Sequence, residues 1–307
     1  MVKMLLFFIF ISQALAQSVT VKKVGSNIYL HGRDCNFLMK QADAINQWKN
    51  PQALPLSSEN CICSPNCAID VTKIVPKQVQ EKQEVCAAHD GPNCWNSTLV
   101  TSGILSHFRY SEGAEMKFWM ESPLCKERAA TEPLQPGDII AIRNAKGEEV
   151  HGFIHLTNEL SFSKNGFAKE SKYALQTPEY VFSGYGVPKL CRRFYKKPGN
   201  TSPECPNYAN YFKCESMEDY LKKHPITNNE QLLTWQTLDS VECEVSELAF
   251  TKVLSEEQLA LFKMSITAIA SLALQKLALT TLTNDEKFIW KGISVKSWSL
   301  MEQIRLL

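Results

Sequence analysis

Eleven cysteines in 307 residues are the feature that most constrains this chain. In an oxidising compartment such cysteines pair as disulfides, whereas in the cytosol they are more often metal ligands or catalytic thiols. Because the number is odd, the sequence predicts up to five disulfides and at least one cysteine left over. The compartment therefore decides how the cysteines are interpreted.

The first residues have the pattern of a secretory signal peptide. Lys3 supplies the positive charge, residues 4–11 are apolar, and Ala14 and Ala16 mark a cleavage site before Gln17. The alternative is an ordinary buried N-terminal helix. Residues 1–16 are predicted to be removed, which makes the mature protein secreted or periplasmic. The segment after the cleavage site does not begin with cysteine, so a bacterial lipid anchor is not indicated.

The charge balance excludes some classes of partner. The 33 Lys and Arg residues face 32 Asp and Glu residues, and loss of Lys3 leaves the two sets equal. No basic excess favours a nucleic acid or an anionic membrane. The apolar stretch 259–282 is interrupted by Lys263 and Lys276, and its uncharged centre is too short to cross a bilayer. We therefore expect no nucleic-acid partner and no transmembrane segment after signal cleavage.

Three regions follow the signal peptide, at residues 17–83, 84–195 and 196–307. The first has a strand at 27–30, a helix around 36–48 and a proline-broken loop over 51–76. Cys61, Cys63 and Cys67 are closely spaced in this loop. They could bind metal in a reducing cell, but disulfides are favoured in a secreted chain.

The last region begins with a turn-rich, cysteine-containing link over residues 198–214. Helical patterns dominate beyond it, starting with a capping box formed by Ser255 and Gln258. These helices are expected to cover a groove or to form a separate domain that binds a protein partner.

The middle region, residues 84–195, carries the candidate chemistry. Apolar residues recur at helical spacing from Trp95 to Phe108, so a helix is predicted to begin at Cys94 with Asn93 as its N-cap. A helix N-terminus favours thiolate over thiol, and its N–H groups can face an oxyanion. The alternative is that Cys94 is half of a disulfide. The odd cysteine count favours a free Cys94.

Two histidines follow on one predicted strand. A turn at Pro136-Gly137-Asp138 leads into an apolar strand, and His151, Phe153 and His155 then share a face of the next one. The two imidazoles stand about 13 Å apart, so at most one of them serves Cys94.

These residues resemble the NlpC family of cell-wall cysteine peptidases, a branch of the papain-like superfamily. The resemblance rests on Cys94 at a helix start, the Pro-Gly-Asp turn, and the segment from His151 to Leu156. It implies an α+β papain-like core in which a nucleophile helix packs on a small antiparallel sheet. It also implies that Cys94 is the nucleophile and His151 the general base, with His155 a packed or rim residue where the family usually has Tyr.

A third polar group would orient the imidazole from the next strand. If Thr157 and Asn158 form the hairpin turn, Ser163 or Lys164 lies opposite His151. Lysine cannot accept the ring N–H, so Ser163 is preferred, with Asn165 nearby as a second choice. The alternative for Ser163 is a solvated serine on an edge strand.

The resemblance implies a cysteine amidase or endopeptidase that acts on peptidoglycan stem peptides through a thioester. Ser-Gly usually follows the nucleophile in the family, but Trp95-Asn96 follows it here. The alternative is an inert, disulfide-stabilised papain-like scaffold that binds or has a structural role. No phosphate-binding glycine loop or metal-ligand cluster suggests a cofactor or a metal.

Two glycosylation sequons begin at Asn96 and Asn200. A glycan on Asn96 would block access to Cys94, so we expect a bacterial chain in which the sequons are accidental.

Overall fold

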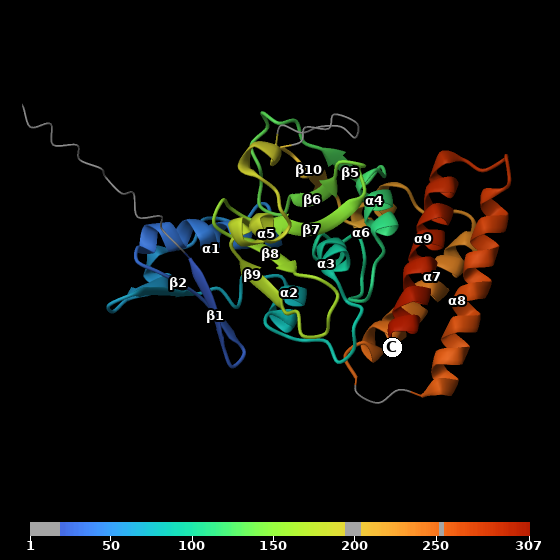
Figure 1. The fold of residues 1–307 in the computed structure, drawn as a ribbon, viewed down its shortest axis with the longest axis horizontal. Helices are drawn as coiled ribbons and strands as arrows, with labels where there is room; N and C mark the ends of the chain where they lie inside the picture. The colour runs from blue at the N-terminus through green and yellow to red at the C-terminus, as the bar shows by residue number, and fades with distance from the viewer. Residues whose placement is uncertain (1–18, 194–203, 252–254) are drawn as a thin grey trace, which may run out of the picture.

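The computed structural model describes residues 19–193, 204–251 and 255–307, which form an α+β fold with two antiparallel sheets (Figure 1). The predicted signal peptide and the sequon at Asn200 lie outside the described residues. The mixed α+β class predicted from the sequence is confirmed. Along the longest axis, an N-terminal sheet, a central sheet and a group of long helices follow one another (Figure 1).

The N-terminal sheet has the strand order β1-β2-β4-β3. Its strands are β1 (Thr20–Val24), β2 (Asn27–Gly32), β3 (Cys61–Cys63) and β4 (Cys67–Asp70). Helix α1 (Cys35–Lys49) packs on this sheet through buried residues that include Leu38 and Ile45. The predicted strand and helix are confirmed. The predicted loop instead contains β3, β4 and the short helix η1 (Ser58–Asn60).

The central sheet has the strand order β5-β10-β6-β7-β8-β9. Its strands are β5 (Cys125–Glu127), β6 (Ile139–Asn144), β7 (Glu149–His155), β8 (Ser161–Lys164), β9 (Tyr173–Gln176) and β10 (Asn207–Cys214). Strand β10 pairs with both β5 and β6, so residues 207–214 of the predicted link over 198–214 form a strand of this sheet, and the prediction is wrong there. Residues 208–212 are all buried inside the sheet. The turn-forming residues before them make the segment resemble a loop when only neighbouring positions are considered.

Helices cover both faces of the central sheet. α3 (Cys94–Thr101) and α4 (Gly113–Met120) lie on one face, because a Cβ atom on Gly152 of β7 would meet Thr98 at 3.1 Å and Met116 at 2.9 Å. α5 (Pro178–Gly184) lies on the other face, where Phe182 packs on Phe153 at 5.3 Å between ring centroids. The short helices α2 (Lys77–Lys82) and η2 (Lys189–Cys191) complete this part.

The helix that begins at Cys94 is shorter than its apolar pattern predicts. It ends at Thr101, although apolar residues recur at helical spacing as far as Phe108. Gly103 has a φ of +77°, a conformation that glycine adopts without steric cost, and the chain turns away there. Phe108 is still buried, but it reaches the core from a loop.

The C-terminal region is helical, as predicted. Its helices are α6 (Met217–Lys223), α7 (Asn229–Leu248), α8 (Glu256–Leu277) and α9 (Asn284–Leu306). Ser255 caps α8 by accepting a hydrogen bond from the Gln258 backbone at 3.4 Å. Helix α9 joins the group to the central region, because Phe288 packs edge-on against Trp119 of α4 at 5.9 Å. One apolar core extends from the N-terminal sheet to α9.

A buried network of charges fastens α7 and α9 to the central region. Arg109 donates to Glu115 at 2.7 and 2.8 Å and to Glu242 of α7 at 2.8 Å. Lys296 of α9 lies 2.6 Å from the second oxygen of Glu242. Arg109, Glu115 and Glu242 are fully enclosed, and Lys296 nearly so. Burial alone would raise the pKa of Glu242, but Lys296 and Arg109 outweigh it and lower the pKa.

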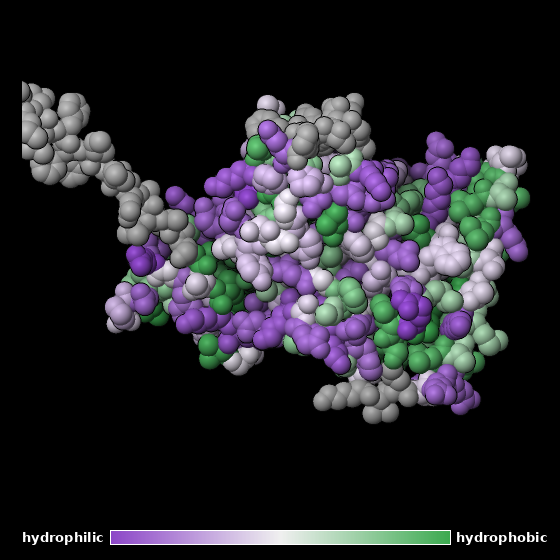
Figure 2. Space-filling model, viewed as in Figure 1, coloured by the Kyte–Doolittle hydropathy of each residue, from purple (hydrophilic) through white to green (hydrophobic). Residues whose placement is uncertain are grey.

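Helix α8 presents an apolar outer face. Leu261, Met264 and Leu274 are exposed on it, and Figure 2 shows apolar colour along this edge of the molecule. By length and composition alone α8 could cross a membrane, a property it shares with core helices of soluble proteins. Its inner residues pack on α7 and α9. The absence of a transmembrane segment therefore stays a prediction.

Candidate active site

Cys94 is the first residue of α3, as predicted. Asn93 caps the helix by accepting from the Asn96 backbone at 3.1 Å, and its amide donates to the Ser111 carbonyl at 2.6 Å. The two bonds fix the loop that leads into the helix. They place the Cys94 thiol, which is 5% exposed, beneath the surface at the helix N-terminus.

Cys94 is unpaired, but it is not the one cysteine left over. All eleven cysteines lie in the described residues, and they form four disulfides, Cys35–Cys61, Cys63–Cys67, Cys125–Cys214 and Cys191–Cys205. Cys86, Cys94 and Cys243 are free. The predicted disulfide framework is confirmed, with one bridge fewer than the maximum. The odd number of cysteines therefore does not single out Cys94. Its candidacy as a nucleophile rests on its position in the fold.

The surroundings of the Cys94 sulfur shift the pKa of the thiol in opposite directions. Burial is the largest influence and raises the pKa of the thiol to about 11. The backbone N–H groups of Gly152, Trp95 and Cys94 itself, and the Lys164 ammonium group, lower it by less. Desolvation therefore outweighs the helix N-terminus, and in this closed arrangement Cys94 is a thiol at neutral pH.

His151 is fully buried in β7. Its ring stacks on Tyr185 at 3.8 Å between centroids and lies 6.0 Å from Phe153. Neither ring nitrogen has a hydrogen-bond partner among the described residues. Desolvation lowers the pKa of His151 to about 3, so the imidazole is neutral. A buried, unpartnered imidazole is costly in a purely structural role.

The ring of His151 makes no hydrogen bond to the sulfur of Cys94. The N–H of Gly152, the residue after His151, is directed at the sulfur. The His151 ring projects from the other face of β7, because the Cβ position of Gly152 faces α3 and alternate residues face opposite sides. The strand that carries the predicted base thus contacts the predicted nucleophile through its backbone.

Tyr185 covers this site. Its ring stacks on His151, and its pKa is raised first by burial and then by the Cys94 thiol. It also lines a pocket of about 480 Å3 with Asn165 and Tyr180. Tyr185 therefore lies between His151 and this pocket.

Ser163 does not contact His151 in the structure. It donates to Asn165 at 2.9 Å and accepts from Gln176 at 2.7 Å, within a polar group on β8 and β9. The hairpin register differs from the predicted one: His155 pairs with Ser161, so Ser163 lies opposite Phe153 by continuation. The predicted placement of Ser163 or Lys164 opposite His151 is wrong.

The hairpin turn explains the changed register. The Thr157 hydroxyl accepts from the backbone N–H groups of Glu159 at 3.1 Å and Leu160 at 3.0 Å. The loop therefore includes Glu159 and is one residue longer than the two-residue turn that the sequence suggests. When the pairing of β8 with β7 shifts by one residue, each side chain of β8 moves to the opposite face of the sheet. Lys164 therefore points toward α3.

His155 is the last residue of β7, four positions after His151. It is 6% exposed and lines a separate pocket of about 900 Å3 with Gln41 of α1 and Phe182 of α5. Burial, and then Arg193, lower its pKa to about 4. This agrees with the expectation of a packed or rim residue.

Lys164 belongs to the site, although the sequence analysis set it aside. Its side chain is fully buried, and its ammonium group donates to the carbonyls of Ala168 at 2.9 Å and Gly166 at 3.3 Å. No carboxylate in the described part of the chain lies within ion-pair distance of it, and the Cys94 sulfur is its foremost electrostatic partner. Desolvation lowers its pKa to about 8. A Lys that interrupts an apolar strand pattern is the signal that could have identified it.

Removal of this charge is expected to slow alkylation of Cys94. In Lys164→Met the thiolate loses a cation that lowers its pKa, so its reaction with iodoacetamide at pH 7, where the ammonium group is still charged, should be about three-fold slower or more. Lys164→Arg should keep the rate. Mass spectrometry of the alkylated peptides measures the rate at each free cysteine. Cys243, on α7, serves as the internal reference. An unchanged Cys94 rate in Lys164→Met would show that the ammonium group does not act on the sulfur.

The Asn96 sequon is buried within α3. The Asn96 amide donates to the His107 carbonyl at 3.2 Å and accepts from the Arg109 backbone at 2.9 Å, and the residue is fully enclosed. A glycan there is incompatible with this fold. This agrees with the expectation that the sequon is accidental.

The cysteines of the N-terminal sheet are the residues that could hold a metal. The sulfur atoms of Cys35, Cys61, Cys63 and Cys67 all lie within 4.8 Å of one another. Tetrahedral Zn²⁺ with bonds of about 2.3 Å separates its sulfur ligands by about 3.8 Å. Here the four are paired as disulfides, whose sulfurs are not thiolate ligands.

Comparison with protein-family models, curated proteins and solved structures gives no match to this chain. The functional argument therefore rests on the geometry of its own residues.

Proposed function

We propose that this protein is a secreted cysteine hydrolase with a papain-like core, in which Cys94 attacks an amide carbonyl. One observation carries the proposal: an unpaired cysteine begins the helix that packs on the central sheet, and the N–H after His151 is directed at its sulfur. A helix start and a backbone donor at one sulfur are the parts from which an acyl-transfer site is built.

Each group has a defined role in the proposed reaction. His151 takes the proton of the thiol only after β7 rearranges, because its ring now projects from the strand face opposite to Cys94. A neutral imidazole is the form that accepts a proton. Cys94 forms the thioester, and water hydrolyses it. The N–H groups of Gly152 and Trp95 stabilise the thiolate, and the Lys164 ammonium group supplies positive charge nearby. Ser163, the expected orienting residue, acts only after β8 rearranges toward His151.

The proposed site is closed at rest. Cys94 and His151 are buried and uncharged, and Tyr185 lies between His151 and the adjacent pocket. Entry of substrate displaces the Tyr185 ring, which hydrates the pair and moves both pKa values toward neutrality. Gly186, with a φ of +62°, follows Tyr185 and permits this movement.

The proposed substrate is a peptidoglycan stem peptide or a related amide. The four disulfides agree with an oxidising, extracytoplasmic environment, in which a cell-wall substrate is accessible. The NlpC resemblance of residues 84–195 supplies the substrate class.

A binding scaffold is the second candidate. It is favoured by the raised pKa of Cys94 and by the lack of any hydrogen bond at His151 among the described residues. In that case the protein acts through binding or as a structural component, and the thiol has no catalytic role.

Replacement of Cys94 by alanine is expected to abolish release of peptides from purified peptidoglycan. Nucleophile removal in cysteine and serine hydrolases costs at least about a thousand-fold in rate. Liquid chromatography and mass spectrometry of the soluble muropeptides measure the difference. Cys86→Ala is the matched control, because Cys86 is also a free cysteine but lies exposed. Identical product profiles for wild type and Cys94→Ala, with retained binding to sacculi, would favour the scaffold instead.

A further inference from the structure

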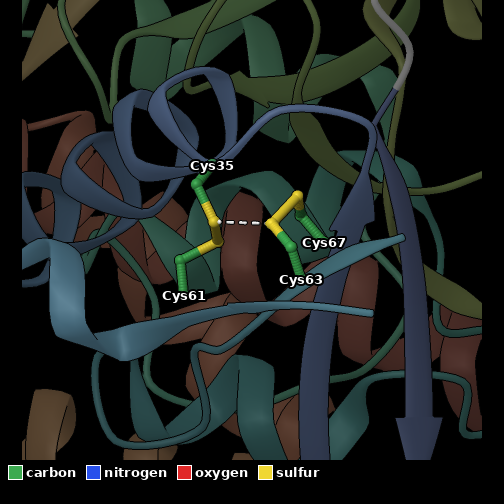
Figure 3. Close-up of side chains that lie close together, drawn as sticks. All are labelled: Cys35, Cys61, Cys63 and Cys67. Carbon is green, nitrogen blue, oxygen red and sulfur yellow. Dashed lines mark hydrogen bonds between the residues drawn. A yellow bond between two sulfur atoms is a disulfide. The ribbon is translucent and has the colours of Figure 1, made fainter. Parts of the chain in front are cut away.

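Two disulfides of the N-terminal region form one cluster of four sulfur atoms. Cys35 begins α1, Cys61 and Cys63 lie on β3, and Cys67 begins β4 (Figure 3). The bridges are Cys35–Cys61 and Cys63–Cys67. Every sulfur of one bridge lies within 4.8 Å of every sulfur of the other, so the fold does not separate the two bridges.

The contact between the bridges is closest at Cys35 and Cys63. Their sulfur atoms are 3.1 Å apart without being bonded, as the dashed line in Figure 3 marks. Atoms held about 3 to 3.5 Å apart are at the distance from which a bond can form. Little backbone movement is therefore needed to exchange the partners of these cysteines.

Solvent reaches the cluster from one side. Cys63 is exposed, Cys35 and Cys61 are half-buried, and Cys67 is buried. Exposed Ile62 lies between the two cysteines of β3, so no larger element covers this strand. An external thiolate therefore reaches the sulfur of Cys63 first, and disulfide exchange begins at an accessible sulfur.

We propose that this cluster is a thiol–disulfide exchange site that switches between two pairings. The observed pairing is Cys35–Cys61 with Cys63–Cys67, and the second is Cys35–Cys63 with Cys61–Cys67. The co-reactant is a low-molecular-weight or protein thiol, which acts as a catalyst and is regenerated.

The exchange balances in three steps. The external thiolate bonds to Cys63, and the Cys63–Cys67 bond breaks to release a thiolate on Cys67. The Cys67 thiolate bonds to Cys61, and the Cys35–Cys61 bond breaks to leave a thiolate on Cys35. The Cys35 thiolate then bonds to Cys63 across the 3.1 Å contact and expels the external thiolate. No net oxidation or reduction occurs.

The switch acts on a helix that lines the larger pocket. Cys35 is the first residue of α1, and Gln41 of the same helix accepts a hydrogen bond from Thr157 in the β7–β8 turn. Both Gln41 and Thr157 line the pocket of about 900 Å3. A change of partner at Cys35 thus alters the anchor of a helix that contacts the central region.

Peptide mapping of the wild-type protein, incubated with reduced glutathione, tests the proposal. Trypsin releases peptide 34–40, which holds Cys35, and peptide 50–73, which holds the other three cysteines, and the disulfide of Cys35 joins the two. Fragmentation of this linked pair shows whether Cys35 is bonded to Cys61 or to Cys63. We expect the Cys35–Cys63 bond in about a tenth of the molecules or more, and a glutathione adduct on Cys63. Recovery of Cys35–Cys61 alone would overturn the proposal.

The variant Cys67→Ser makes the test independent of the adduct. It leaves three cysteines, one of which is free, and alkylation marks which one. Exchange predicts the label on both Cys63 and Cys61, whereas a fixed pairing predicts it on Cys63 only and contradicts the proposal. Cys214→Ser is the matched control, since it frees Cys125, whose label should stay in place. Four free thiols holding zinc in the purified protein would also overturn it.

Discussion

Replacement of Glu242 by Gln is expected to lower the free energy of unfolding by about 3 to 5 kcal/mol, because it removes the counter-charge that two buried cations share. Glu242 is fully enclosed and contacts Arg109 at 2.8 Å and Lys296 at 2.6 Å. Glutamine keeps the shape but removes the charge, so Glu115 alone then faces Arg109. Urea denaturation followed by tryptophan fluorescence measures the change.

Glu244→Gln is the matched control for this prediction. Glu244 lies on the same helix, two residues away, and is exposed. Its replacement should change the stability by no more than about 0.5 kcal/mol. A similar small effect for Glu242→Gln would mean that the network contributes no net stability and that apolar packing alone holds α7 and α9 in place.

Lowering the pH is expected to destabilise the wild-type protein, because His151 binds a proton more readily in the unfolded chain than in the folded one. His151→Phe should remove this part of the pH dependence. The folded pKa is about 3, against an ordinary value of 6.5, so the unfolded chain binds the proton first as the pH falls. The contribution of His151 to the free energy of unfolding is complete above pH 6.5. It is lost between pH 6.5 and about pH 3, at roughly 1.4 kcal/mol per pH unit. Over this window the loss reaches about 4 to 5 kcal/mol.

Phenylalanine suits this test because His151 makes no hydrogen bond within the described residues and stacks on Tyr185. Unfolding curves at pH 7.5 and pH 4.5 measure the difference. His155→Phe should recover nearly as much between these two pH values, since the pKa of His155, about 4, also lies below pH 4.5. Equal pH dependence in wild type and His151→Phe would show that the ring is hydrated in the folded protein.

The sequence predicted the elements that depend on local signals. Asn93 and the apolar repeat after it define the start of α3, and both depend on neighbours within one or two turns. The strand that holds His151 follows in the same way from alternation. The free thiol at Cys94 was also predicted, although the parity argument for it does not hold, because Cys86 and Cys243 are free as well.

The sequence could not predict features that depend on distant parts of the chain. The turn at Thr157 accepts two backbone bonds and changes the register, so Lys164, and not Ser163, turns toward α3. The direction of the Cys94 pKa also differs from the expectation. A helix N-terminus can be read from sequence, but the extent of burial that outweighs it cannot.

Strand β10 gives the chain a requirement during its synthesis. It lies between β5 and β6, yet more than sixty positions separate the end of β6 from its start. Until residues 207–214 leave the ribosome or the export channel, β6 is an open edge that can pair with another nascent chain. The predicted catalytic region, 84–195, therefore cannot close its own sheet, and a chain that stops there should aggregate. The central sheet is therefore complete only after the segment that follows the predicted catalytic region has been synthesised.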